Sequence, residues 1–231
     1  MFEDSWSVIS AFIVFYLGIL ITLKMSKYLK IKNKRGLLIY IWHTLFCFIY
    51  LFYVKNFGGD AIGYYNAAVN GYSDFNFGTA AVNGLTSLLV HGLGFGLISC
   101  FLFFNILGTI GLLYFDAALS YANRDKGVFF KRLSTLIIFL PSVSFWTSAI
   151  GKDAISFLAM GLALWAALKL NKRVPLMVSA VFLMLAVRPH IAGMMIIALS
   201  MSVLFDKETN IAKRSFLGLV SIVGLAVLVP F

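Results

Sequence analysis

Apolar residues form long, nearly continuous runs along this chain, and short polar connections separate the runs. A helix that crosses about 30 Å of hydrocarbon needs roughly 20 residues, so the length of the chain leaves room for about seven or eight transmembrane helices. The pattern therefore predicts an all-α, polytopic helical membrane protein, organised as a single transmembrane domain over residues 1–231. The last run stops at Phe231 without a polar tail, which is what a piece of a longer chain would show.

The first half of the chain is predicted to hold three spans and one long connection. The spans are expected at Trp6 to Lys24, Leu37 to Val54 and Phe95 to Leu119. Residues 55–94 form the connection after the second span. Its later part is glycine-rich and apolar, and it is too interrupted for a clean span. We expect it to form interfacial helices that lie on the outer leaflet.

Two prolines divide the apolar runs of the second half. Proline lacks a backbone donor and disfavours helix in the residue before it, so breaks are predicted at Pro141 and Pro189. The apolar segments beside these prolines are shorter than a standard span. They fit either pairs of helices that meet at the outer face or discontinuous helices that lean on a cavity.

Composition supports the membrane class. Hydrophobic residues make up 61% of the chain and charged residues 12%, with a mean hydropathy of +0.94. Soluble domains carry about 25% charged residues, so this chain has too few charges for a soluble surface.

The net charge of +10 would suit nucleic acid, but its distribution argues against that partner. Basic residues gather beside apolar runs, and the alternate connections lack such clusters, as the positive-inside rule describes. This pattern predicts cytoplasmic clusters and an N-terminus outside. The clusters are Lys24, Lys27, Lys30, Lys32, Lys34 and Arg35; Arg124, Lys126, Lys131 and Arg132; Lys169, Lys172 and Arg173; and Lys207, Lys213 and Arg214.

Three basic residues lie outside these clusters, at Lys55, Lys152 and Arg188. A charge within hydrocarbon costs about 2.5–3.5 kcal/mol, so such residues mark a boundary or a functional cavity. Lys152 and Arg188 stand at the two breaks, where cations suit a phosphate-bearing ligand because arginine can hold two oxygens at once. The alternative is that both side chains extend to lipid headgroups, or that Lys152 pairs with Asp153 to settle a helix end.

The segment Gly58-Gly59-Asp60-Ala-Ile-Gly-Tyr64-Tyr65 directly follows the second span. A carboxylate above the membrane, followed by two phenols, suits a general base that acts on a sugar hydroxyl. Asp60 would equally serve as the N-cap of an interfacial helix. The two interpretations are compatible.

Other polar residues suggest structural roles. Asp116 lies near the cytoplasmic end of the third span, where a basic residue is the simplest partner. Cys47 and Cys100 are expected to be buried free thiols. No segment has metal-ligand spacing, and no cofactor is predicted.

Three segments together carry a resemblance: Gly59-Asp60-Ala-Ile-Gly-Tyr64-Tyr65, Phe-Trp146-Thr-Ser-x-x-Gly-Lys152-Asp153 after a proline, and Arg188-Pro-His190. They resemble polytopic glycosyltransferases that use polyprenyl-phosphate-linked sugars, of the GT-C type or the Wzy or EpsG type of polysaccharide polymerase. The resemblance implies that Asp60 is the catalytic base and that Lys152, Arg188 and His190 bind the lipid-linked phosphate or diphosphate. We therefore predict catalytic roles for Asp60 as base and His190 as proton donor, and substrate binding by Tyr64, Tyr65, Trp146, Lys152, Asp153 and Arg188.

The resemblance also implies a bacterial inner (plasma) membrane protein of cell-envelope polysaccharide biosynthesis, with its site on the outer (periplasmic or extracellular) face. Its partners would be the lipid bilayer, a polyprenyl-phosphate-linked sugar, a glycan acceptor and other membrane subunits. The chain is shorter than these enzymes, and its single first-loop carboxylate leaves the use of a divalent metal open. The rival hypothesis is a transporter, a flippase-like protein or an assembly subunit. Span centres that hold few polar residues besides His43 and Asn105 disfavour a transport route.

Overall fold

The computed structural model describes residues 5–71 and 76–204, and this part of the chain is all-α. The elements are α1 (Ser5–Leu29), α2 (Asn33–Phe57), α3 (Asp60–Val69), α4 (Thr79–Ser87), the π-helical turn η1 (Leu88–Gly92), α5 (Leu97–Ala122), α6 (Val128–Ile138), α7 (Pro141–Thr147), α8 (Lys152–Ala167), α9 (Leu170–Val187) and α10 (Pro189–Leu204). The helical class predicted from the sequence is confirmed. The last apolar run of the sequence, from Phe216 to Phe231, lies outside the described residues.

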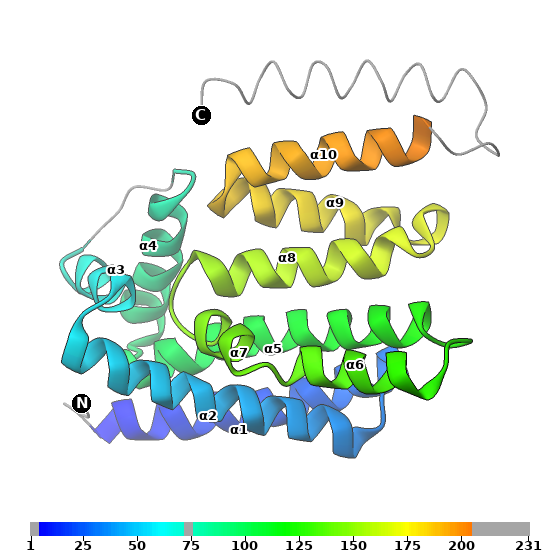
Figure 1. Ribbon diagram of the computed structural model, residues 1–231. Helices are drawn as coiled ribbons and strands as arrows, with labels where there is room; N and C mark the ends of the chain where they lie inside the picture. Colours follow the sequence, from blue (N-terminus) through cyan, green and yellow to red (C-terminus); the bar gives the residue numbers. More distant parts are fainter. Residues whose placement is uncertain (1–4, 72–75, 205–231) are drawn as a thin grey trace.

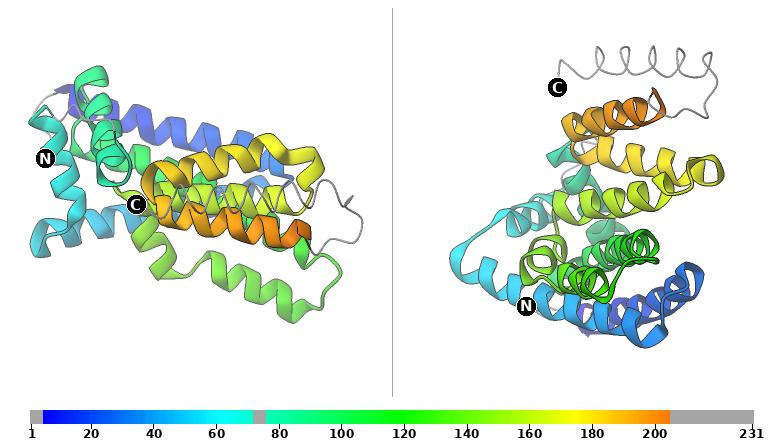
Figure 2. Two further views of the ribbon diagram at one scale, coloured as in Figure 1. Left: turned by 90° about the horizontal axis from the view of Figure 1, so that it is seen from above. Right: turned by 45° about the vertical axis from the view of Figure 1, so that its right-hand side comes forward.

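The longer helices run lengthwise side by side, and the short helices α3 and α4 lie at one end of this bundle (Figures 1 and 2). Helix α5 is central and contacts α1, α2 and α8. In its most apolar stretch 78% of the residues are buried, against 28% in α1. Apolar side chains such as Phe12 and Tyr16 are left exposed on α1. Such an apolar outer surface suits contact with a lipid bilayer.

In the described part of the chain, four helices are long and apolar enough to cross a membrane: Ser5–Leu29, Asn33–Phe57, Leu97–Ala122 and Val128–Thr147, the last joining α6 and α7. The prediction of seven or eight spans is therefore wrong for the described residues. Helices α8 and α10 have 16 residues each, about 24 Å at 1.5 Å per residue, which is less than the hydrocarbon thickness. Helix α9 carries two cations, Lys172 and Arg173, in its first turn and is kinked at Arg173.

Both predicted breaks are present. Helix α6 ends at Ile138, and Pro141 opens α7 in the first helical turn, where its missing donor costs nothing. Helix α9 ends at Val187, Arg188 is non-helical with φ −143° and ψ 75°, and Pro189 starts α10. The chain reverses there, so α9 and α10 pack side by side (Figure 1).

Glycines allow the central helices to touch through their backbones. A Cβ on Gly161 of α8 would lie 2.4 Å from the carbonyl oxygen of Gly111 in α5. A Cβ on Gly108 would lie 2.1 Å from the Thr147 carbonyl oxygen. Small residues at helix interfaces are the usual means of close packing within membranes. Helix α5 thereby sets the positions of both α7 and α8.

A buried ion pair holds the end of the bundle that is opposite α3 and α4. Arg35 donates from Nε to Asp116 Oδ2 at 2.9 Å and from Nη2 to Asp116 Oδ1 at 2.7 Å. Its Nη1 donates to Thr135 Oγ1 at 3.3 Å, so the guanidinium joins α2, α5 and α6. The predicted basic partner of Asp116 is confirmed. Cys47 and Cys100 are buried and free, as predicted.

Candidate functional site

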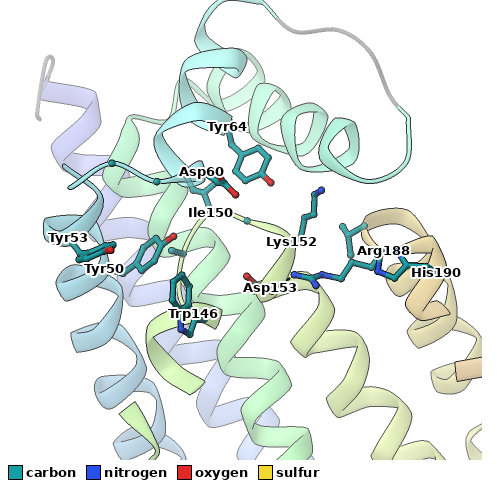
Figure 3. Close-up of a pocket in the computed structure, with 15 residues that line it drawn as sticks. Tyr50, Tyr53, Asp60, Tyr64, Trp146, Ile150, Lys152, Asp153, Arg188 and His190 are labelled. Atoms are coloured by element: carbon teal, nitrogen blue, oxygen red, sulfur yellow. Dashed lines mark hydrogen bonds and ion pairs between the residues drawn. The ribbon is translucent and has the colours of Figure 1, made fainter. Parts of the chain in front are cut away.

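A cavity of about 490 Å³ lies at the end of the bundle, beside α3. Figure 3 shows that its polar side chains come from separate parts of the chain: α3, the start of α8, and the turn between α9 and α10. It brings together seven of the eight predicted site residues: Asp60, Tyr64, Trp146, Lys152, Asp153, Arg188 and His190. The loop motif and the two proline breaks therefore meet at one place.

Tyr65 is the predicted site residue that the cavity does not include. It lines a different cavity of about 350 Å³, together with Lys55 and Asn66. Consecutive residues of an α-helix point about 100° apart, and on α3 this turn places Tyr64 at the Asp60 cavity and Tyr65 at the other one. The prediction that they act together is not supported.

Asp60 reaches the cavity through a glycine turn. Gly58 has φ +79°, a left-handed conformation that glycine adopts without strain, and it ends α2. Gly59 is the N-cap of α3, and Asp60 is its first residue with no side-chain capping bond. The interpretation of Asp60 as an N-cap is therefore wrong. Its exposed side chain is directed into the cavity (Figure 3).

Arg188 and Asp153 form an ion pair across the cavity wall. Arg188 Nη2 donates to Asp153 Oδ1, which links the end of α9 to the first turn of α8. The Nε atom of Arg188 is buried and has no hydrogen-bond partner within residues 5–71 and 76–204. Asp153 thus holds the guanidinium in place and leaves it with donor capacity for a ligand.

Lys152 does not pair with its neighbour Asp153, contrary to one alternative drawn from the sequence. Among the described residues it has no carboxylate within ion-pair distance. In Figure 3 its side chain extends from the start of α8 toward α3 and Tyr64. This cation is available to an anionic ligand in the cavity.

Three helices begin at this cavity: α3 at Asp60, α8 at Lys152 and α10 at Pro189. The first turn of a helix presents unpaired N–H groups and the positive end of the helix dipole, which together favour anions. The side chains of Lys152, Arg188 and His190 add positive or protonatable groups. Asp60 and Asp153 also line the cavity, so the groups that favour an anion such as phosphate are confined to the wall formed by Lys152, Arg188 and the starts of α8 and α10.

Aromatic side chains that the sequence analysis missed form another wall. Tyr50 and Tyr53, three residues apart on α2, line the cavity with Trp146. The centroids of the Tyr50 and Trp146 rings are 5.9 Å apart. The centroid of the Phe145 ring lies 4.9 Å from that of Tyr50 and 5.2 Å from that of Trp146. Trp146 remains 54% exposed, so its ring is accessible to a ligand. The i, i+3 spacing of Tyr50 and Tyr53 could have predicted this wall, because residues three apart lie on the same face of a helix.

A second cavity of about 340 Å³ shares Asp60, Tyr64 and Lys152 with the first, and adds Thr79 and Asn83 from α4. The Asn83 Oδ1 atom is buried and has no hydrogen-bond partner in the described part of the chain. Burial raises the pKa of Tyr64 above its usual value, and the negative charge of Asp60 acts in the same direction. The phenol therefore stays protonated at neutral pH and can donate a hydrogen bond.

Within the described residues, no group of three or more His, Cys, Asp or Glu side chains is placed to hold a metal ion. Comparison of the chain with protein-family models, with curated proteins and with solved structures finds no match.

Proposed function

We propose that this protein is a membrane glycosyltransferase or polymerase that acts on a polyprenyl-phosphate-linked glycan. The observation that carries the proposal is the meeting of Asp60 with Lys152, Arg188 and His190 in one cavity at the end of an apolar helical bundle. An amphipathic donor fits this place because its polyprenyl chain can stay in the bilayer while its phosphate enters the cavity.

The phosphate side of the cavity is formed by Arg188, Lys152 and the first turns of α8 and α10. Charge-assisted hydrogen bonds from arginine to phosphate are roughly twice as strong as neutral ones. Asp153 holds Arg188 in the orientation that the ligand meets. These groups stabilise the negative charge that builds up on the departing phosphate in the transition state.

In the proposed reaction Asp60 takes the proton from an acceptor hydroxyl while the hydroxyl oxygen attacks the anomeric carbon of the donor sugar. A new glycosidic C–O bond forms, and the C–O bond to the lipid phosphate breaks. The electron pair leaves with the phosphate, next to Arg188 and Lys152. Protonated His190 can supply a proton to that leaving group, and the Asp60 proton is released to solvent.

The sugar would lie between the aromatic wall and the second cavity. Tyr50 and Trp146 offer ring faces, the Tyr64 phenol donates a hydrogen bond, and the buried Asn83 oxygen accepts one from a hydroxyl. A buried acceptor without a partner costs about 1–3 kcal/mol, so a ligand hydroxyl that satisfies it gains that amount in binding.

The proposed side of action is the outer face of a bacterial inner membrane, because the basic clusters of the described chain lie at the opposite end of the bundle. A transport function finds less support. The buried Asn105 donates to Thr44 at 2.8 Å, and neither it nor His43 lines the Asp60 cavity.

Asp60→Asn tests the proposal. The amide keeps the volume of the side chain but cannot take a proton, so turnover of a polyprenyl-phosphate-linked sugar in liposomes should fall by about two to four orders of magnitude. Because Asp60 makes no capping bond, the thermal melt should stay nearly unchanged. Asp125→Asn, in an exposed loop outside the cavity, is the matched control and should keep full turnover. Normal turnover of Asp60→Asn would show that Asp60 is not the catalytic base and would refute the proposed reaction.

A further inference from the structure

The opposite end of the bundle holds another cavity, of about 740 Å³. It lies where α1 meets α2 and α5 meets α6, and it shares no residue with the Asp60 cavity. Its basic lining residues are Lys30, Lys32, Arg35, Arg124 and Lys131.

The positive charge of this cavity is not balanced by its carboxylates. Asp116 is the only acidic residue among those that line it, and Arg35 already neutralises Asp116 through two hydrogen bonds. Asp125 follows Arg124 in the loop but does not line the cavity. Within residues 5–71 and 76–204, the remaining cations therefore face a common space that holds no further carboxylate.

The backbone adds to this imbalance. Helix α2 begins at this cavity with Lys32 as its N-cap, and its first turn contains Lys34 and Arg35 but no acidic residue. Cations at a helix N-terminus are unfavourable because that end of the dipole is positive. An anion bound in the cavity would relieve both the dipole and the side-chain repulsion.

Lys30 supplies an independent indication. It has φ +60°, and it is the non-glycine residue with a positive φ in the described part of the chain. It ends α1, and the next amide, of Ile31, donates to the Ser26 carbonyl at 2.8 Å, which is the closing bond of a helix C-terminus that usually uses glycine. The turn therefore places a lysine side chain at the cavity, at a position that usually holds glycine.

We propose that this cavity binds a phosphate group, carried either by the headgroup of an anionic phospholipid or by a soluble phosphate ester. Basic pockets between transmembrane helices suit such headgroups. The apolar walls at Leu29, Ile31 and Trp165 can contact the glycerol and first acyl carbons of a lipid. This inference does not depend on the reaction proposed for the Asp60 cavity.

The test uses the full chain in a neutral detergent and two probes. Phosphatidylglycerol, with phosphatidylcholine for comparison, is titrated and bound lipid is counted by native mass spectrometry. Glycerol 3-phosphate without lipid is the second probe, and its binding is followed by thermal shift. Selective binding of phosphatidylglycerol identifies the headgroup as the ligand. Equal binding of glycerol 3-phosphate identifies a soluble ester, and binding of neither probe overturns the proposal.

Two variants separate a binding role from a structural one. Lys30→Gly removes the charge and relieves the backbone, so its melting temperature should hold or rise while affinity falls about fivefold. Lys131→Gln should weaken binding by a similar factor. Lys34→Gln is the control, because Lys34 is exposed at the same helix end but does not line the cavity. An unchanged affinity in Lys30→Gly, or an equal loss in Lys34→Gln, would refute a specific site.

Discussion

Gly161→Ala tests whether the contact between α5 and α8 controls the Asp60 cavity. The added Cβ would meet the Gly111 carbonyl oxygen at 2.4 Å, whereas ordinary contact begins at 3.4 Å. The obstacle is backbone, which no side-chain rotation can move, so the two helices must separate by about 1 Å. Helix α8 begins with Lys152 and Asp153, so this displacement is carried to the cavity.

Two opposing effects set how much Gly161→Ala changes the free energy of unfolding. Alanine is favoured over glycine in a helix by about 1 kcal/mol, which would stabilise the variant. Overpacking a close interface costs about 1–3 kcal/mol, and the backbone obstacle places this site toward the upper end. We therefore expect a net destabilisation of about 1–2 kcal/mol. A misplacement of about 1 Å at reacting groups also lowers turnover by about 100-fold.

The assay compares thermal melts and donor turnover of the purified protein in liposomes. Gly63→Ala is the control for stability, because a Cβ at Gly63 in α3 meets nothing within 4 Å. That variant should be stabilised by about 0.5–1 kcal/mol. If Gly161→Ala melts at the same temperature as Gly63→Ala and keeps wild-type turnover, the packing argument is wrong.

Two further predictions concern the ligand and the orientation. Arg188→Lys should lower donor turnover by at least about tenfold, since lysine cannot reproduce a two-point grip on phosphate; wild-type turnover would favour simple contact with headgroups. Cysteines placed at Asn70 and Lys126, two exposed positions, should react with an impermeant reagent from outside intact cells at 70 but not at 126. Labelling at 126 would reverse the proposed orientation.

The sequence predicted the helical class and the two helix breaks because both follow from local chemistry, whereas the meeting of distant polar residues in one cavity is a tertiary feature. Proline restricts its own backbone and that of its neighbour, so the breaks beside Pro141 and Pro189 could be located. Lys152 and Arg188 could be identified as candidate site residues because a charge within an apolar segment, far from the basic clusters, marks a boundary or a functional cavity. The partner of Asp116 could be assigned to a basic cluster, but its identity as Arg35 depends on how α2 packs on α5.

The errors came from features that depend on packing or on helix phase. The number of spans was overestimated because it was taken from the length of the chain, although the apolar segments beside the two prolines are shorter than a standard span; α8 and α10 have 16 residues each. Tyr65 was grouped with Tyr64 by adjacency, although the helix turns it to another surface. Asn83 was missed because its significance is a buried oxygen without a partner, which only the tertiary structure shows. The placement of the loop helices at a membrane interface stays a prediction.

The ion pair between Asp153 and Arg188 has a consequence for the order in which the protein is made. A ribosome completes Asp60 128 residues before it reaches Arg188, and α8 is finished before the turn between α9 and α10 exists. Until that turn arrives, Asp153 lacks its partner Arg188, and the cavity lacks the wall that this turn forms. Packing of the α9–α10 pair is thus the step at which a nascent chain first acquires the whole cavity. A chain released before Arg188 would carry Asp60 without the arginine of the proposed phosphate site.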